Sequence, residues 1–213
     1  MSKWTRVTRP LAAVALCGVV LTSLQGCVEM AIGTAVVGTL AATDRRTFGA
    51  QTEDKTIVLK GESRVANLVG GAGHVNVTSF NRKVLLTGEV RDEAMKAAVE
   101  REVSAIENVQ SVINELEVMG VSSFTSRSND SLITGKVKAS FVDAKDLYAN
   151  AIKVVTERGV VYLMGRVTQR EGNLAADVAS NVSGVHKVVK VFEYISEEDY
   201  NRLTKTSEQQ NKQ

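Results

Sequence analysis

One short stretch of the sequence occurs twice, and it constrains the fold more than any other feature. Residues 84–90 read Val-Leu-Leu-Thr-Gly-Glu-Val, and residues 161–167 read Val-Tyr-Leu-Met-Gly-Arg-Val. In both copies every second position is apolar or glycine, which is the pattern of a half-buried β-strand. Gly88 and Gly165 occupy a place where a strand bends or closely approaches another backbone. A repeat of this kind predicts two copies of one folding unit.

The repeat extends on both sides of this strand. An earlier apolar segment predicts a first strand, polar residues then predict a hairpin turn, and a helical stretch and a closing strand follow. These segments are 75–77, 81–83, 97–106 and 109–118 in the first copy, and 152–154, 157–159, 174–182 and 185–194 in the second. The glycine-dense residues 70–73 lack the lysine and hydroxyl residue of a phosphate-binding loop, so we expect them to join a helix to a strand.

An amphipathic segment led by an acidic residue precedes the first strand of each copy. Asp54 and Asp130 are expected to cap these helices by accepting hydrogen bonds from free backbone N–H groups. Each unit is therefore predicted to be an α+β domain of the order αββαβ, with a three-stranded sheet and two helices on one face. The first domain is placed at residues 53–118 and the second at residues 130–195. Whether the domains pack together or are joined only by a short linker stays open. Glu89 and Arg166, which follow the two glycines, are expected to face solvent.

The start of the chain has the features of an export signal. Three basic residues precede an apolar run at 11–24, which is too short to span a membrane but suits a secretory signal. The run ends in Leu-Gln-Gly-Cys, which resembles the lipobox of bacterial lipoproteins. We therefore expect residues 1–26 to be a signal peptide and Cys27 to be lipidated; the alternative is an ordinary signal peptide with a chance cysteine. By resemblance to the sorting rule of Gram-negative bacteria, Val28 after the cysteine favours the outer membrane, facing the periplasm.

Three segments lie outside the predicted domains. Residues 27–52 are rich in small residues and are expected to be a tether; a second membrane span is the alternative, but the apolar part is short and interrupted by Glu29. Residues 119–129 are expected to be a polar linker. Residues 196–213 are expected to be a flexible tail, which has helix-start signals at Ser196 but no apolar face farther on.

At this point a resemblance can be named. The pattern of a helix led by aspartate, then V-x-V, V-x-L-x-G-x-V, a helix and G-V-x-x-V-x-N resembles the BON domain, here in two copies behind a lipobox. Asn108 and Lys190 depart from the pattern without changing its apolar positions. The resemblance implies a dual-BON outer-membrane lipoprotein without enzymatic activity. It also implies binding of anionic phospholipid, of the phosphatidylglycerol or cardiolipin type, through the second domain, in support of outer-membrane integrity.

One predicted helix offers a surface for this role. At 100° per residue, Ile133, Val137 and Phe141 fall on the core side. The opposite side shows the expected lipid-binding residues, which are Leu132, Gly135, Lys136 and Ala139. Leu132 would insert among acyl chains while Lys136 meets phosphate; the alternative is that Leu132 is one scattered surface leucine. The corresponding face of the first domain carries more acidic residues. Residues 53–118 have a net charge of −3 (8 basic, 11 acidic) and residues 130–195 of +2 (9 basic, 7 acidic).

Other function classes find little support. The chain has two histidines and, beyond Cys17 in the signal, only Cys27, and it lacks the common catalytic and zinc-binding spacings. No enzyme activity, cofactor or metal is therefore predicted. After removal of three basic residues the balance is 23 basic to 24 acidic groups, so nucleic-acid binding is not expected. The remaining alternative is a periplasmic protein-interaction module that recruits an envelope assembly or cell-wall partner by strand addition.

Overall fold

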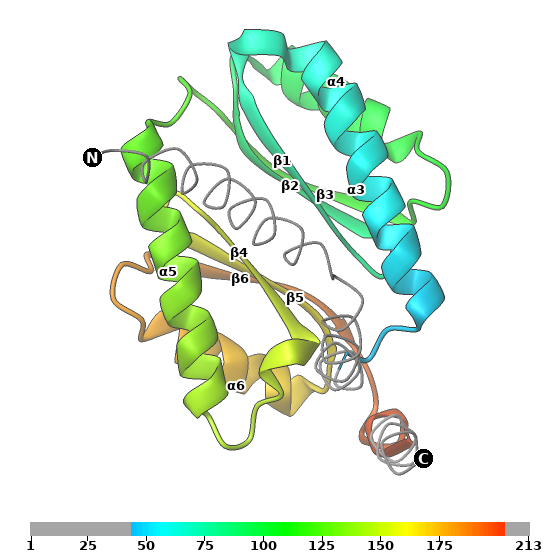
Figure 1. The fold of residues 1–213 in the computed structure, drawn as a ribbon, viewed down its shortest axis with the longest axis vertical. Helices are drawn as coiled ribbons and strands as arrows, with labels where there is room; N and C mark the ends of the chain where they lie inside the picture. Colours follow the sequence, from blue (N-terminus) through cyan, green and yellow to red (C-terminus); the bar gives the residue numbers. More distant parts are fainter. Residues whose placement is uncertain (1–43, 203–213) are drawn as a thin grey trace, which may run out of the picture. The chain divides into compact units, whose positions relative to one another are not determined.

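The computed structural model describes residues 44–202, which form two successive α+β domains with the same order of elements (Figure 1). The first domain comprises α3 (Phe48–Val69), η1 (Gly70–Ala72), β1 (His74–Phe80), β2 (Lys83–Val90), α4 (Glu93–Ser104) and β3 (Ser111–Val118). The second comprises α5 (Phe124–Asp143), η2 (Ala149–Ala151), β4 (Ile152–Glu157), β5 (Val160–Val167), α6 (Gln169–Ser180) and β6 (Lys187–Tyr194). The predicted α+β fold with two αββαβ units is confirmed, and η1 joins helix to strand as expected.

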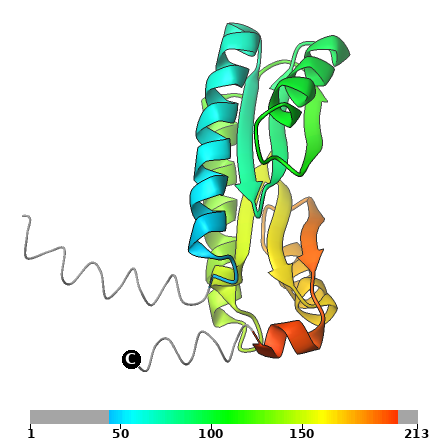
Figure 2. The same cartoon turned by 90° about the vertical axis from the view of Figure 1, so that its right-hand side faces the viewer.

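Each sheet has three strands with the repeated glycine strand in the centre. The orders are β1-β2-β3 and β4-β5-β6, with the first pair antiparallel and the second pair parallel in both. Val75 lies opposite Gly88, and Ile152 lies opposite Gly165, so the two copies share one register. A parallel pair needs a crossover connection, and α4 and α6 supply it. The view turned by 90° shows α3 running along the sheet of its own domain (Figure 2).

One face of each sheet packs against its two helices. In the first domain the central residues are Ile57 of α3, Leu86 of β2 and Val99 of α4, all fully buried. In the second they are Val137 of α5 and Leu163 of β5, with Ala175 of α6. The predicted core residues Ile133 and Phe141 belong to this second cluster. Alternation along the strands places every second side chain in these cores.

The opposite faces of the two sheets pack against each other. Phe80 and Leu85 of the first domain form a third apolar cluster with Tyr162, Met164 and Val191 of the second. Polar contacts surround this cluster, and several of them join side chains across the interface: Asn76 Nδ2 donates to Glu157 at 2.8 Å, Asn81 Nδ2 donates to Glu193 at 2.6 Å, and Arg158 forms an ion pair with Glu117 at 3.1 Å. The two domains are therefore packed together rather than joined only by a linker.

The helix caps differ from the prediction. The side chain of Thr47 accepts a hydrogen bond from Ala50 N, and Ser123 accepts one from Ser126 N. Helix α3 thus begins at Phe48, inside the segment 27–52 expected to be a tether. Helix α5 begins at Phe124, inside the expected linker. The assignment of Asp54 and Asp130 as N-caps was wrong, because polar Ser/Thr residues farther upstream start both helices.

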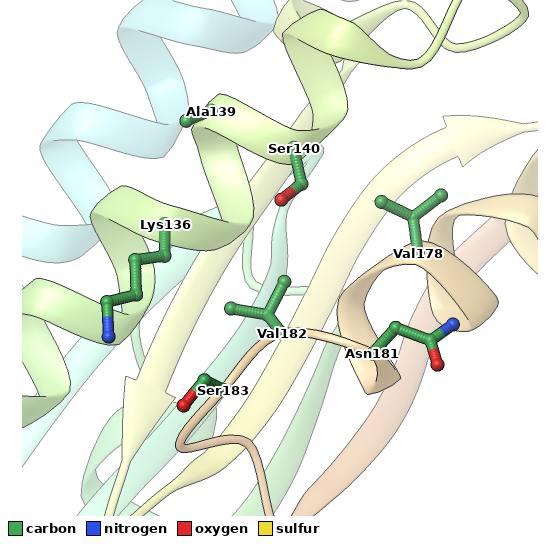
Figure 3. A pocket seen from close by; sticks show the side chains of 7 residues that line it. All are labelled: Lys136, Ala139, Ser140, Val178, Asn181, Val182 and Ser183. Atoms are coloured by element: carbon green, nitrogen blue, oxygen red, sulfur yellow. The ribbon is translucent and has the colours of Figure 1, made fainter.

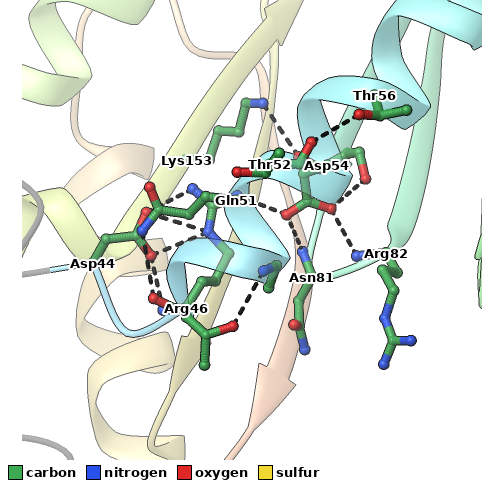
Figure 4. A network of polar contacts seen from close by, with 12 residues as sticks. Asp44, Arg46, Gln51, Thr52, Asp54, Thr56, Asn81, Arg82 and Lys153 are labelled. Carbon is green, nitrogen blue, oxygen red and sulfur yellow. Dashed lines mark hydrogen bonds and ion pairs between the residues drawn. The ribbon is translucent and has the colours of Figure 1, made fainter.

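Asp54 and Asp130 instead hold the hairpin turns. Asp54 is buried and accepts hydrogen bonds from Asn81 N at 2.7 Å, from Arg82 N at 2.8 Å and from Ser79 Oγ at 2.6 Å (Figure 4). Both turn residues have positive φ, 51° and 64°, as a type I′ hairpin requires. In the second domain Asp130 accepts from the backbone N–H groups of Arg158 and Gly159 at 2.9 and 2.8 Å. The two aspartates therefore tie a helix to a turn that lies 27 to 29 residues later.

Two further expectations need correction. Glu89 does not face solvent: it is fully buried against the second domain, and Arg166 is partly buried and bonded to Glu193 at 3.0 Å. Their strand positions point away from the helices, but that face is covered by the other sheet. The expected tail also contributes structure, because the helix start at Ser196 is confirmed by its bond from Asp199 N and residues 197–202 are helical. Tyr200 packs edge-on against Tyr148.

Candidate membrane-binding site

Helix α5 exposes a row of apolar and small side chains on its outer side. Leu132 is 65% exposed, and Gly135, Lys136 and Ala139 are also exposed, so the structure places all four expected residues together on one accessible face. The row continues to Phe124 and Val142, which are 79% and 73% exposed. At 100° per residue these side chains span an arc of about 120°. We call this row, Phe124, Leu132, Gly135, Lys136, Ala139 and Val142, the outer ridge of α5.

The direction of the outer ridge is fixed by the opposite side of the helix. Ile133, Val137 and Phe141 are buried in the core of the second domain. Asp130 adds a polar tie through its two bonds to the hairpin turn. The helix therefore cannot rotate about its axis without exposing three apolar side chains and breaking these bonds, so the ridge remains on the surface.

An open groove adjoins the ridge between α5 and the end of α6. It has a volume of about 620 Å³ and shares Lys136 and Ala139 with the ridge (Figure 3). Val178 and Val182 form its apolar part, and the remaining lining residues are Ser140, Asn181 and Ser183. Figure 3 shows the amine of Lys136, on α5, and the hydroxyl of Ser183, after α6, at the same end of the groove. A hydroxyl and an ammonium group beside apolar side chains can bind a phosphate and its attached hydrocarbon.

The outer side of α3 is the natural comparison. It also exposes large apolar residues, Phe48 and Leu59, with Leu59 at 69%. Among the described residues of this helix, however, acidic Glu62 lies close to exposed Lys60 and Leu59. The outer ridge of α5 carries Lys136 and has an acidic residue, Asp143, only at the end of the helix. Both helices therefore expose a lysine near apolar side chains, and the outer side of α3 differs by the acidic Glu62 in the same part of the helix.

A pair of adjacent arginines connects the two domains, which the sequence analysis missed. Arg45 donates to Glu171 of α6 through Nη1 at 2.8 Å and Nη2 at 2.6 Å, and its guanidinium lies 4.7 Å from the ring of Tyr200. Arg46 turns the other way, to Asp54 of the first domain at 2.8 Å. Glu171 also accepts from Thr168 N and so completes the capping box of α6. The segment before α3 thereby fixes one domain relative to the other.

Two buried carboxyl groups lie in the interface between the sheets. Glu157 accepts a hydrogen bond from Asn76, whereas neither carboxyl oxygen of Glu89 has a partner within residues 44–202. Burial raises the pKa of Glu157 to about 7, and the charge of Glu89 adds to this increase. The pKa of nearby His74 is lowered, first by burial and then by the charge of Arg127. The sequence analysis assigned no functional role to Glu89, Glu157 or His74.

Several expectations cannot be examined in the described part of the chain. Cys27, the signal peptide and most of the expected tether lie outside residues 44–202. Within that range no helix has the length and hydropathy needed to cross a bilayer. The same range contains no group of three or more His, Cys, Asp or Glu side chains arranged to hold a metal ion.

Comparison with known proteins decides the family. The family model of the BON domain matches residues 54–120 and, a second time, residues 129–196. The chain belongs to the BON-domain family. Its two BON domains therefore correspond to the two αββαβ units of the structure.

The chain is similar to two named proteins over most of its length. The chain is 43% identical over 175 residues to the outer membrane lipoprotein DolP of Haemophilus influenzae, covering 81% of this chain and 90% of that protein. It is 34% identical over 161 residues to the 21 kDa hemolysin of Actinobacillus pleuropneumoniae, covering 71% and 79%. The prediction of a protein with two BON domains is thus confirmed, and the similarity to DolP supports an outer-membrane lipoprotein of the BON family. Neither relative is named as an enzyme.

A solved structure of CdsD, a structural protein of the type III secretion system of Chlamydia trachomatis, also aligns with this chain. The alignment covers 70% of this chain and 97% of the other at 12% identity, with a TM-score of 0.29. A likeness this distant carries no argument about function.

Proposed function

We propose that this protein is a lipid-anchored outer-membrane protein, facing the periplasm, whose second BON domain binds anionic phospholipid through the outer ridge of α5 and supports outer-membrane integrity. The observation that carries the proposal is the exposure of Leu132, Gly135, Lys136 and Ala139 on one face, extended by Phe124 and Val142. Apolar side chains would enter the acyl region while Lys136 remains at the phosphates. Lipidation of Cys27 would hold the protein at the same membrane.

The adjoining groove supports the proposal, because its lining offers polar and apolar groups to a headgroup. A phosphate beside Lys136 would lie within reach of Ser183, and Ala139 with Val182 would contact the first part of the hydrocarbon. Gly135 and Ala139 favour a close approach of the helix backbone to the membrane, since neither has a long side chain. In this arrangement the ridge supplies apolar burial and the groove supplies polar contacts to one phospholipid.

Flotation with phosphatidylglycerol vesicles tests the proposal directly. Burying a leucine side chain contributes about 1.5–3 kcal/mol, so Leu132→Glu is expected to weaken vesicle binding by about tenfold or more. The matched control is Leu59→Glu on α3, which changes an equally exposed leucine in the first domain and should leave binding intact. Equal loss in both variants, or no loss with Leu132→Glu, would overturn the assignment of the ridge.

A gain of binding provides an independent test. A Cβ placed at Gly135 meets no atom within 4 Å, so a larger side chain fits there without disturbing the fold. Gly135→Leu should therefore strengthen binding to phosphatidylglycerol vesicles, because it adds apolar surface to the ridge. Binding should weaken between about 0.1 M and 1 M salt, where the screening length falls from about 10 to 3 Å.

Failure of the unaltered protein to bind protein-free vesicles would favour the second candidate, a module that recruits an envelope assembly or cell-wall partner. Strands β1, β3, β4 and β6 are the edges of their sheets and could accept an added strand. No comparable row of exposed apolar side chains argues for that role, so lipid binding stands first.

A further inference from the structure

The interface between the two BON domains encloses a carboxyl group without a hydrogen-bond partner among the described residues. Glu89 of β2 is fully buried, and neither of its oxygens has a hydrogen-bond partner within residues 44–202. Glu157 of β4 is 6% exposed and accepts one bond, from Asn76 at 2.8 Å. Transfer of an unpaired carboxylate out of water is costly. Two such groups near each other add mutual repulsion when both are ionised.

Several other titratable groups surround this pair. In the first domain His74 of β1 lies near Glu89, and Glu117 of β3 pairs with Arg158 at 3.1 Å. Among the groups of the second domain, Asp130 of α5 accepts the backbone N–H groups of the hairpin turn. The remaining titratable groups close to the interface are Glu115 of β3, Tyr162 of β5 and Arg127 of α5, whose Nη1 lies 3.5 Å from His74 Nδ1. No ion pair to Glu89 or Glu157 occurs within the described residues.

We propose that the contact between the two BON domains is pH-dependent, and that it is tight only while Glu157, beside the enclosed carboxyl group of Glu89, holds a proton. With Glu157 neutral, its side chain is accommodated near Tyr162, Met164 and the surrounding apolar side chains of the interface. With both ionised, two unpaired negative charges lie between the sheets, and the domains separate to let water reach them. Each domain keeps its own core, which lies on the opposite face of its sheet.

The direction of the effect follows from burial. The pKa of Glu157 is raised from 4.5 to about 7 by burial and by the charges of Glu89 and Asp130, against the Asn76 hydrogen bond and Arg127. A raised pKa means that the docked form prefers the neutral acid. Its stabilisation is therefore complete below pH of about 4.5 and is lost as the pH rises through about 7. His74 acts in the opposite direction, because its lowered pKa makes the docked form resist protonation in acid.

Thiol labelling in the folded state measures the opening of this contact. We would use the mature chain with Cys27→Ser, which has no other cysteine, and place a reporter at Met164→Cys in the interface. A second reporter, Val161→Cys, lies in the helix-side core and reacts only when the domain unfolds. Rates are corrected for the thiolate fraction with an exposed reporter, Lys60→Cys.

The comparison of the parent chain with Glu157→Gln decides the question, because His74 contributes equally to both. The equilibrium constant for opening at Met164→Cys in the parent, divided by that in Glu157→Gln, should increase about tenfold between pH 6 and pH 8. The same ratio at Val161→Cys should not increase. Glu107→Gln, an exposed control, should behave as the parent. If Glu157→Gln does not fold, Glu89→Gln replaces it. Identical pH profiles in parent and variant, or equal acceleration at both reporters, would overturn the proposal.

Discussion

The two BON domains have the same interior and different exteriors. Asp54 and Asp130 hold equivalent turns, and the two sheets share one register. The outward sides of the first helices differ, because α5 carries Lys136 in a row of exposed apolar side chains whereas α3 has Glu62 beside Leu59. The difference teaches that buried positions and turn contacts define the fold. The outward positions of the two first helices are not constrained in this way, and their side chains differ between the two copies.

The interface between the domains also differs between the two copies at one equivalent strand position. Glu89 and Arg166 follow the two repeated glycines and point to the same face of their sheets. Arg166 reaches Glu193 at 3.0 Å and donates to Arg45 O at 3.2 Å, whereas Glu89 is enclosed without a partner. Equivalent sequence positions therefore meet different surroundings in the two domains.

The largest expected difference concerns the two repeated glycines. Gly88 has φ of +115°, and a Cβ there would lie 2.1 Å from His74 O; Gly165 lacks a positive φ, and its Cβ would lie 2.6 Å from Ala151 O. Gly88→Ala should lower the free energy of unfolding by about 5 kcal/mol. Gly165→Ala should lower it by about half as much, since its backbone conformation suits alanine. Urea unfolding of both variants measures the two losses of free energy. Equal losses would show that the positive φ of Gly88 adds nothing to the cost of placing a Cβ there.

The aspartates that hold the turns come next. Asp54→Ala leaves two backbone donors, Ser79 and Arg46 without their acceptor, so it should cost about 4 kcal/mol. Asp130→Ala removes two backbone bonds and should cost about 2–3 kcal/mol. Exposed Asp143→Ala is the control and should change stability by less than about 0.5 kcal/mol. A larger loss for Asp130 than for Asp54 would contradict the role of the additional contacts in the first domain.

Periodicity and repetition were sufficient to predict most of the fold. The alternation in residues 84–90 and 161–167 determines strands with one face against helices, and the paired copies give the order αββαβ. The exposure of Leu132 also follows from helical spacing, because Ile133, Val137 and Phe141 require the opposite side for the core. These features depend on residues close together in the sequence, so their pattern is readable in one chain.

The features that could not be predicted depend on contacts between distant residues. Asp54 resembles a helix cap until Asn81 and Arg82 fold back onto it. Glu89 resembles a solvent-facing residue until the second sheet covers it. Arg45 has no local signal at all, because its partner Glu171 lies 126 residues later. The packing of the two sheets explains Glu89, whereas the roles of Asp54 and Arg45 depend on a hairpin turn and on α6, which lie far along the chain.

The arginine link should have an intermediate effect and act mainly on the second domain. Arg45→Ala leaves Glu171 buried with an unmatched charge, which should lower the free energy of unfolding by about 3 kcal/mol. Glu171→Gln in the same chain should recover part of this loss, because it removes the charge while keeping the capping box of α6. Urea unfolding of the single and double variants gives the coupling between the two residues. Additive losses would show that they stabilise the protein independently.

The smallest expected effect concerns the exposed leucines that distinguish the surfaces. Leu132→Glu and Leu59→Glu should each change the free energy of unfolding by less than about 0.5 kcal/mol, since both side chains are about two-thirds exposed. Leu132→Glu should even be slightly stabilising, because a glutamate there precedes Lys136 by four residues on the same helix, a pairing worth about 0.2–0.5 kcal/mol. Thermal unfolding of both variants measures this. A loss above about 1 kcal/mol in Leu132→Glu would mean that this leucine supports the fold, and its loss of vesicle binding would then no longer separate the outer side of α5 from that of α3.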